Sequence, residues 1–271
     1  MKYTVCYSGG HSSALVAIEA VRKYGKKNVI LLNHDISSMV EHEDIKRFKR
    51  QVAEYLDIEI TPANMDDFEE MTPLRVCRKI GAFQAQPGQA LCTYNIKTKP
   101  FNEWLLNNYP ADIDHIREDI KILYGFDKSE PERIQRRSSI LSTKGYRTDF
   151  PLAFWNRTIF DTKEIGIEKP RTYKIFKHAN CIGCLKAGIQ HWYIVYCLRQ
   201  DIFQEALQAE KEIGYSIIKG SFLEDLIPRY EDMKRKGICP NDIENSAKFW
   251  AKVDHVMPEQ LSFLPCDCAL L

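Results

Sequence analysis

Six consecutive residues near the N-terminus, Ser8-Gly9-Gly10-His11-Ser12-Ser13, have the residue types that bind a phosphate group. The preceding residues, 3–7, are β-branched and aromatic, as in a buried strand, and a helix-forming segment follows and ends at Gly25. Glycine makes the turn at little steric cost, and we expect Ser12 and Ser13 to cap the helix. Backbone N–H groups, hydroxyls and a helix N-terminus then meet at one point, which favours a phosphate, although glycines that serve only the turn would give the same pattern.

Two further segments place polar side chains where a ligand would bind. Residues 28–33 (NVILLN) are a continuous apolar run, typical of a strand covered on both faces, and Asp35 follows its carboxyl end. Residues 119–126 (DIKILYGF) predict another strand, and Arg133 then lies about one turn into a helix. A guanidinium at that position can form a forked contact with an anion, so we expect Arg133 to point into the same crevice.

The nine cysteines predict a metal centre. Two thiols in the spacing Cys181-x-x-Cys184, with a glycine between them, can hold one ion and usually form half of a site. The missing ligands could come from Cys92, from Cys239, or from the pair Cys266-x-Cys268, which would complete a zinc-type set of four. The alternatives are a redox dithiol, which lacks the usual thioredoxin-like setting here, and free thiols at the C-terminus.

The expected secondary structure predicts a doubly wound parallel sheet. Strands at 3–7, 28–33 and 58–61 alternate with helices, of which 41–56 places Ile45, Phe48, Val52 and Tyr55 on one apolar face. Such a β-α-β-α-β series gives parallel strands joined by right-handed crossovers. Pro73 is expected to interrupt a helical stretch.

The C-terminal part of the chain is expected to be mostly helical. Its four expected helices are 189–198, 201–213, 222–236 and 242–253. We therefore expect an α/β nucleotide-binding domain over residues 1–175. A helical region with the Cys-x-x-Cys and Cys-x-Cys pairs is expected over 176–271.

Composition narrows the class of protein. The chain has 271 residues, 44% of them hydrophobic and 28% charged, as in ordinary globular proteins, and a formal net charge of +1. That charge gives no general attraction to nucleic acid or to a membrane surface. No apolar run approaches the ~20 residues that a membrane span needs, and the N-terminus does not have the layout of a signal peptide, so we expect a cytoplasmic protein.

Several motifs resemble those of a known superfamily. The run from Ser8 to Ser13 resembles the SGGxxS loop of the ATP pyrophosphatase (PP-loop, adenine nucleotide alpha hydrolase) superfamily. Four later segments resemble the phosphoadenylyl-sulfate (PAPS) reductase family within it, in the order in which that family carries them. They are Thr98-Lys99-Pro100-Phe101 (RK-x-x-PL), Gly125 with Ser129-Glu130 and Arg133 (ES-x-x-R), Phe150-Pro151-Leu152 with Trp155 (NPL…W), and Cys181 to Cys184 (CxxC).

This resemblance implies a nucleotide enzyme. It would bind ATP with Mg²⁺, or a sulfated adenylate, through residues from Ser8 to Ser13 together with Asp35, Gly125, Glu130 and Arg133. In this interpretation Asp35 lies near the metal or nucleotide, and Lys97 and Arg133 offset developing negative charge. Cys92 with Cys181 and Cys184 would supply ligands for an iron–sulfur cluster; zinc is the alternative metal.

The chain also departs from the reductase pattern. Reductase relatives with a cluster have a cysteine pair where this chain has Leu91-Cys92, and PAPS reductases end in an ECG-x-H tail where this chain ends CDCALL. We therefore expect an enzyme that adenylylates an unidentified acceptor, releases pyrophosphate and transfers sulfur or nitrogen. The alternatives are a PAPS or adenylyl-sulfate reductase with Cys266 or Cys268 as nucleophile, and a non-catalytic nucleotide-binding module with structural zinc. Nucleic acid and a second copy of the chain, forming a homodimer, stay open as partners.

Overall fold

The computed structural model describes residues 1–85, 89–177 and 181–257. Cys266 and Cys268, expected as metal ligands or nucleophiles, lie outside the described residues. No helix among the described residues is long and apolar enough to cross a membrane.

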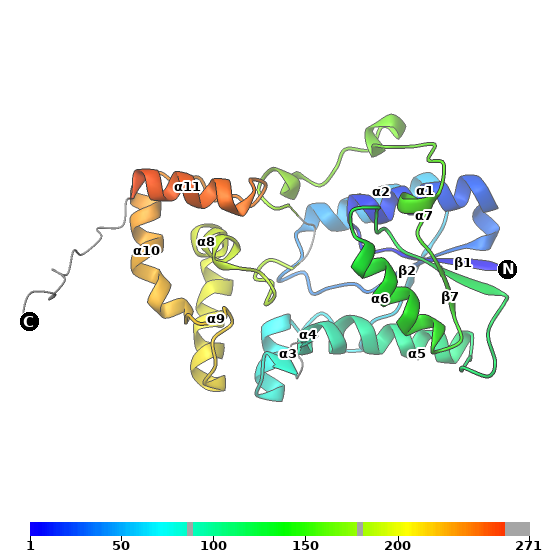
Figure 1. The fold of residues 1–271 in the computed structure, drawn as a ribbon, viewed down its shortest axis with the longest axis horizontal. Coiled ribbons are helices and arrows are strands. Elements are labelled where there is room, and N and C mark those ends of the chain that lie inside the picture. The colour runs from blue at the N-terminus through cyan, green and yellow to red at the C-terminus, as the bar shows by residue number, and fades with distance from the viewer. Residues whose placement is uncertain (86–88, 178–180, 258–271) are drawn as a thin grey trace, which may run out of the picture.

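A five-stranded sheet forms the centre of the N-terminal part (Figure 1). Its order is β3-β2-β1-β6-β7, and every neighbouring pair is parallel. The strands are β1 (Lys2–Cys6), β2 (Val29–Asn33), β3 (Ile60–Pro62), β6 (Ile120–Leu123) and β7 (Arg147–Asp149). The prediction of an α/β protein with a parallel, Rossmann-like sheet is confirmed, while the edge strand β7 was not expected.

Helices cover both faces of this sheet (Figure 1). On one face, α1 (His11–Tyr24) and α2 (Glu43–Leu56) share a core with β1 and β2, and the short α7 (Pro151–Phe154) contacts α1. On the other face, α5 (Lys99–Asn108) and α6 (Pro131–Ser142) pack on β6. The apolar run of β2 is buried from both sides, as a strand between two helical layers should be.

Two local expectations are wrong. Helix α1 begins at His11, with Gly10 as its N-cap, so Ser12 and Ser13 lie inside the first turn and do not cap the helix. In α2, Tyr55 is half exposed at 49%, and the buried face instead includes Lys49 and Leu56. Lys49 is buried because two carboxylates lie within reach of its ammonium group, which helical periodicity cannot reveal.

The segment between β3 and β6 holds short elements. Helix α3 (Pro73–Ile80) begins at Pro73, so the proline starts a helix and does not interrupt one. A two-residue antiparallel pair follows, β4 (Gln84–Ala85) with β5 (Gln89–Ala90). The chain then runs without a break through α4 (Leu91–Thr93) and the π-helical turn η2 (Tyr94–Thr98) into α5. Three 3₁₀ turns complete the elements outside the C-terminal part: η1 (Lys26–Asn28), η3 (Thr162–Ile165) and η4 (Arg171–Lys174).

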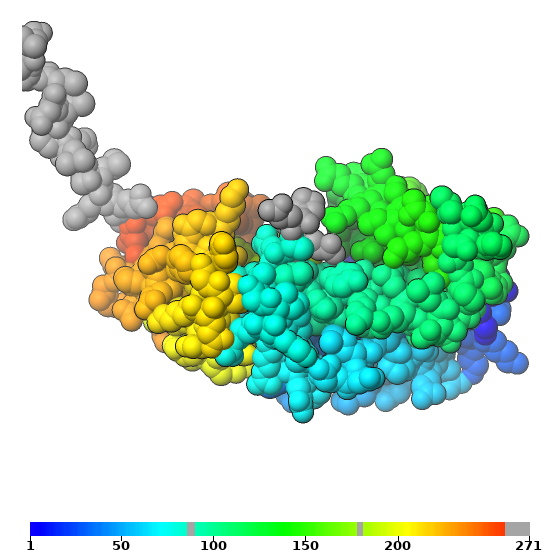
Figure 2. Space-filling model, turned by 90° about the horizontal axis from the view of Figure 1, so that it is seen from below, coloured from blue at the N-terminus to red at the C-terminus, as the bar shows by residue number. Residues whose placement is uncertain are grey.

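The C-terminal part is helical, as expected. Its helices are α8 (Ile189–Leu198), α9 (Gln200–Ile213), α10 (Leu223–Arg235) and α11 (Ser246–Val256). They share one hydrophobic core with α3 and with Ile36 and Val40 of the β2–α2 connection. Figure 2 shows the yellow surface of α9 lying directly against the cyan surface around α3. The core therefore draws on residues from both sides of position 175.

Candidate functional site

The glycine turn lies at the point where the strand order of the sheet reverses. From β1 the chain places β2 and β3 on one side and β6 and β7 on the other, so the reversal falls between β1 and β6. In open parallel sheets, ligands bind at the carboxyl ends of the strands at such a point. The turn from Ser8 to Gly10 follows the carboxyl end of β1 directly, and Gly9 has the positive φ of +80° that favours glycine.

Gly125, just beyond the carboxyl end of β6, is packed against this turn. A Cβ atom at Gly125 would lie 3.1 Å from the Ser12 carbonyl carbon and 3.2 Å from the Ser13 amide nitrogen. These distances bring the two backbones almost into contact, because glycine at position 125 leaves no side chain between them. The sequence-predicted residues at the ends of β1 and β6 are therefore brought together.

The first turn of α1 presents backbone donors at this place. The first intrahelical hydrogen bond runs from the Ala14 amide to the Gly10 carbonyl at 3.1 Å, so the preceding amides have no helical acceptor. The His11 amide donates to the Tyr173 hydroxyl at 3.1 Å, and Ser13 Oγ donates to the Gly10 carbonyl at 2.8 Å. Such an N-terminus, with the positive end of the helix dipole, can hold an anion.

A buried lysine lies beneath the glycine turn. The Lys49 side chain is 4% exposed, and a Cβ atom at Gly9 would lie 2.6 Å from Lys49 Cγ. Its Nζ lies 2.8 Å from Asp35 Oδ1 and 2.7 Å from Glu41 Oε2, and Lys46 Nζ lies 3.4 Å from the other Asp35 oxygen. Lys49 of α2 therefore contacts both Asp35 at the end of β2 and the glycine turn after β1.

These contacts shift the two carboxyl groups in opposite directions. Burial raises the pKa of Glu41, and Lys49 opposes the rise only in part. Burial also acts to raise the pKa of Asp35, but Lys49 and Lys46 outweigh it and the pKa is lowered. Asp35 is thus held as a carboxylate at the edge of the sheet next to the turn, where the sequence predicted it.

The Lys97 ammonium affects the pKa values of two groups, His34 and Cys181. Burial lowers the pKa of His34, next to Asp35, and the Lys97 ammonium lowers it further. Burial also raises the pKa of the Cys181 thiol to about 11, and Lys97 acts against that rise.

Glu130 and Arg133 contact each other and the chain next to them. The Arg133 guanidinium pairs with the Glu130 carboxylate and lies 4.1 Å from the centre of the Phe126 ring, and its side chain is 61% exposed. The Asp127 amide donates to Glu130 Oε2 at 3.3 Å. This cluster lies at the start of α6, after the carboxyl end of β6, with its cation open to solvent. Both partners of the Arg133 guanidinium, Glu130 and Phe126, lie within seven residues of it in the sequence.

Cysteines of three segments, α3, α4 and the Cys-x-x-Cys turn, affect one another's pKa values. Cys77 of α3 and Cys92 of α4 interact, and this interaction lowers the pKa of Cys92 and raises that of Cys77. Beside burial, Cys184 and Cys92 also act to raise the pKa of Cys181. Within residues 1–85, 89–177 and 181–257, however, no three His, Cys, Asp or Glu side chains are arranged as ligands of one metal ion.

The sequence interpretation missed two residues of this cluster. Cys77 stands alone in the sequence and only the packing of α3 brings it to Cys92. His191, on the helix that follows, accepts hydrogen bonds at Nε2 from the Gly183 and Cys184 amides at 3.2 and 3.4 Å. The Ile182 amide donates to the Val40 carbonyl at 2.8 Å, which fixes the Cys-x-x-Cys turn to the β2–α2 connection. A Cys-x-x-Cys followed by a helical histidine is the only sequence signal for this role.

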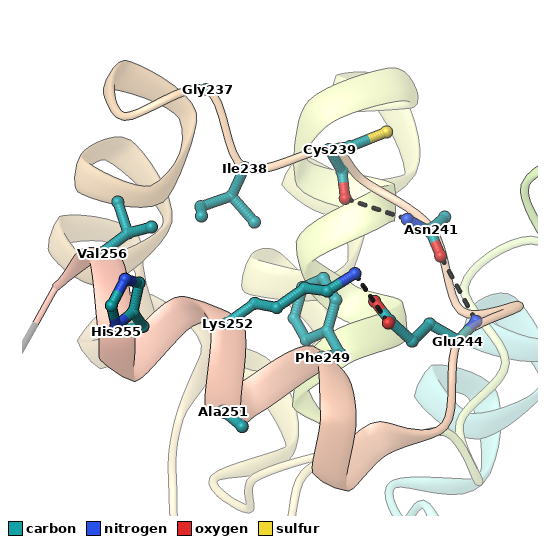
Figure 3. Close-up of a pocket in the computed structure, with 10 residues that line it drawn as sticks. All are labelled: Gly237, Ile238, Cys239, Asn241, Glu244, Phe249, Ala251, Lys252, His255 and Val256. Carbon is teal, nitrogen blue, oxygen red and sulfur yellow. Dashed lines mark hydrogen bonds and ion pairs between the residues drawn. The ribbon is translucent and has the colours of Figure 1, made fainter.

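A separate pocket lies between the end of α10 and α11 (Figure 3). Its wall is largely apolar, and the Lys252–Glu244 ion pair crosses it at 2.7 Å. Figure 3 shows the Cys239 sulfur pointing away from the other labelled side chains. None of the residues predicted for the nucleotide site lines this pocket, so we place the candidate site at the strand reversal.

No family model, no curated protein and no solved structure matches the chain.

Proposed function

We propose that this protein is a nucleotide enzyme of the PP-loop type, with an adenine nucleotide alpha hydrolase-like fold. One observation carries the proposal: at the strand reversal, a positive-φ glycine turn and the side-chain-free Gly125 bring two strand ends together around a helix N-terminus. Such an arrangement suits the terminal phosphates of a nucleotide, because backbone amides can donate hydrogen bonds to them and no side chain blocks their approach.

In the proposed reaction, ATP bound with Mg²⁺ adenylylates an acceptor. An acceptor oxygen attacks the α-phosphorus, the bond from that phosphorus to the bridging oxygen breaks, and pyrophosphate leaves. A sulfur or nitrogen nucleophile then attacks the activated acceptor carbon, and AMP leaves with the oxygen. The amides of the first turn of α1 hold the pyrophosphate, and Asp35, kept ionised by Lys49 and Lys46, supplies a carboxylate beside it. Lys97 offsets negative charge on the phosphates, and Arg133 would join it only after releasing Glu130.

A thiolate-bound metal is the second part of the proposal. Cys77, Cys92 and the Cys181–Cys184 pair are the candidate donors, since thiols of these three segments affect one another's pKa values. No three of the described side chains are already arranged around one ion, so binding would have to bring the ligands closer together. Bound metal would fix the Cys-x-x-Cys turn against α3 and, as an iron–sulfur cluster, would also carry electrons. All seven described cysteines are free, which suits a reducing, cytoplasmic setting. Elemental analysis of anaerobically purified protein distinguishes iron from zinc, and the absence of both would refute this part.

Gly10 offers a sharp test of nucleotide binding. Its φ is −82° and a Cβ atom there would lie 3.5 Å from the Tyr173 hydroxyl, which is an ordinary contact, so other residues fit. Aspartate and asparagine are both favourable N-caps, and neither should destabilise α1. Only the aspartate places a negative charge against the phosphates. We expect Gly10→Asp to weaken ATP binding about 100-fold, with Gly10→Asn and Gly10→Ala close to wild type.

Calorimetric titration with ATP and Mg²⁺, alongside the melting temperature of each variant, measures this. A folded Gly10→Asp protein with unchanged ATP affinity would refute the proposed site. Gly9→Val is the poorer test, because its Cβ would collide with buried Lys49 and unfold the turn. AMP and pyrophosphate as products support attack at the α-phosphorus, whereas ADP and phosphate contradict it. Thiol-dependent sulfite release from a sulfated adenylate would favour the reductase, and ATP binding without turnover would favour the binding module.

A further inference from the structure

A second pocket lies beside the glycine turn and is lined by charged side chains. Arg47 and Gln51 of α2 form one wall, and residues from Asp161 to Lys174 form the other. Its volume is about 700 Å³, which is within the range of pockets that hold small organic ligands. A single phosphate ion would leave most of that volume empty. The pocket therefore has room for an organic molecule that carries an anionic group.

The charges of this pocket do not cancel. Five cationic side chains line it against two carboxylates. Three of the cations are neutralised by close carboxylates: Arg47 by Asp44 (2.6 Å), Lys163 by Glu168 (3.3 Å) and Lys169 by Asp161 (2.7 Å). The other two, Arg171 and Lys174, are exposed, and neither side chain forms an ion pair with a carboxylate of the described residues, although the charge of Arg171 also acts on Asp44. One forked guanidinium and one ammonium are thus left for a ligand.

The pocket shares a wall with the turn that would hold the nucleotide phosphates. Tyr173 lines the pocket, and its hydroxyl accepts the hydrogen bond from the His11 amide in the first turn of α1. Asp161, also in the wall, lies 3.6 Å from His11 Nε2, and the Thr162 amide lies 3.3 Å from the same nitrogen. A ligand in the pocket would therefore lie next to the nucleotide, as two reacting molecules must.

The position of Arg171 is fixed from α2. The Arg171 amide donates to Asp44 Oδ2 at 2.6 Å, and Arg47 donates to the carbonyl oxygens of Glu168 and Lys169 at 3.2 and 3.4 Å. These bonds hold the backbone on both sides of Pro170 against α2. The guanidinium of Arg171 then extends from an ordered point, and less entropy is lost when it binds an anion.

We infer that this pocket binds the phosphate group of the acceptor, so that the acceptor is a phosphate ester and not a neutral metabolite. The inference rests on the proposed function, because it names the substrate class of the same site. Arg171 supplies a forked pair of donors and Lys174 a second positive charge, which together match a phosphate dianion. A small sugar phosphate and a nucleic acid strand share this chemistry.

Two charge-removing variants test the inference on the full chain. Arg171→Gln/Lys174→Gln removes both unpaired charges, and Lys219→Gln/Lys248→Gln removes two exposed lysine charges outside the pocket. The probes are ribose 5-phosphate and a fluorescein-labelled 12-nucleotide RNA, each titrated with and without saturating ATP and Mg²⁺. We expect at least one probe to bind wild type and to lose about tenfold or more in the pocket variant only, with an effect that weakens at high salt.

The pattern of losses separates the sources of the phosphate. Loss of ribose 5-phosphate binding supports a small ester, and loss of RNA binding alone supports a nucleic acid backbone. The inference is overturned if neither probe binds, if both double variants lose equally, or if the pocket variant loses ATP affinity as well, since the pocket would then belong to the nucleotide. Gly10→Asp separates the two proposals: it should weaken ATP binding as stated above and leave probe binding without ATP unchanged.

Discussion

Replacing Lys49 with methionine tests whether its charge, and not its bulk, holds the site together. Methionine keeps an unbranched side chain of similar length under Gly9, where three Lys49 carbons lie within 2.9 Å of the point that a Cβ atom on that glycine would occupy. The variant therefore removes little packing. What it removes is the ammonium group between Glu41, whose side chain is 1% exposed, and Asp35.

The expected loss follows from that burial. Removing one partner of a buried ion pair costs about 3–5 kcal/mol, because the other charge is left buried and unpaired. Asp35 is 27% exposed and keeps Lys46 at 3.4 Å, so most of the cost comes from Glu41. We expect Lys49→Met to lower the free energy of unfolding by about 3 kcal/mol at pH 8. Glu41→Gln in the same chain should restore most of this loss.

The pH dependence has a definite sign. Burial already raises the pKa of Glu41 in the folded protein, and loss of Lys49 raises it further. A carboxyl group whose folded pKa is raised stabilises the fold in its protonated form, and this contribution fades as pH rises through that pKa. The deficit of Lys49→Met should therefore be largest at pH 8 and smaller at pH 5.

Urea unfolding of wild type, both single variants and the double variant at pH 8 and pH 5 measures these quantities. If the slope of the unfolding free energy against urea concentration is the same in all four proteins, the variants differ in stability and not in the surface exposed on unfolding. The reasoning fails if Lys49→Met costs under about 1 kcal/mol at pH 8, or if the effects of Lys49→Met and Glu41→Gln simply add.

Two further substitutions test contacts on either side of the turn. Gly125→Ala should lower stability by about 1–3 kcal/mol and weaken ATP binding, because its Cβ would press on the Ser12 backbone at 3.1 Å. Gly188→Ala, where no atom lies within 4 Å, is the control; equal melting temperatures and ATP affinities for both would contradict the packing argument. Asp44→Asn should cost up to about 2 kcal/mol at pH 7, because the hydrogen bonds from Arg47 hold the pKa of Asp44 at about 2. That stability is present above the ordinary carboxyl pKa and is lost as pH falls through about 2, so urea melts of the two proteins should converge at low pH and not at pH 7.

The sequence predicted the sheet and the turn because both leave local signals. The apolar run of β2 and the glycines after β1 can each be recognised within a few neighbouring residues. The parallel order of the strands follows from their alternation with helices. The edge strand β7 has only three residues, Arg147–Asp149, with no fully buried side chain, so it lacked the pattern of a strand.

The candidate site was predictable only where its residues follow a strand end. Both Asp35 and Gly125 do, and the structure places Gly125 at the strand reversal and Asp35 next to it, at the end of β2. Lys49 appears in the sequence as a charged residue on an ordinary amphipathic helix, and no local pattern distinguishes a buried lysine from a solvated one. Cys77 meets Cys92 only because α3 folds back on α4, which is a tertiary contact.

The shared core of the C-terminal helices sets an order of events during synthesis on the ribosome. Ile36 and Val40 leave the ribosome early, yet other residues of the same core, such as Trp192 and Tyr230, are made about 150 or more residues later. Strand β1 likewise waits for β6, which lies more than a hundred residues along the chain. The nascent N-terminal half therefore carries an open strand edge and an uncovered apolar surface until the last helices appear. Such a chain folds slowly and aggregates when truncated, so a working fragment that ends at residue 175 is not expected.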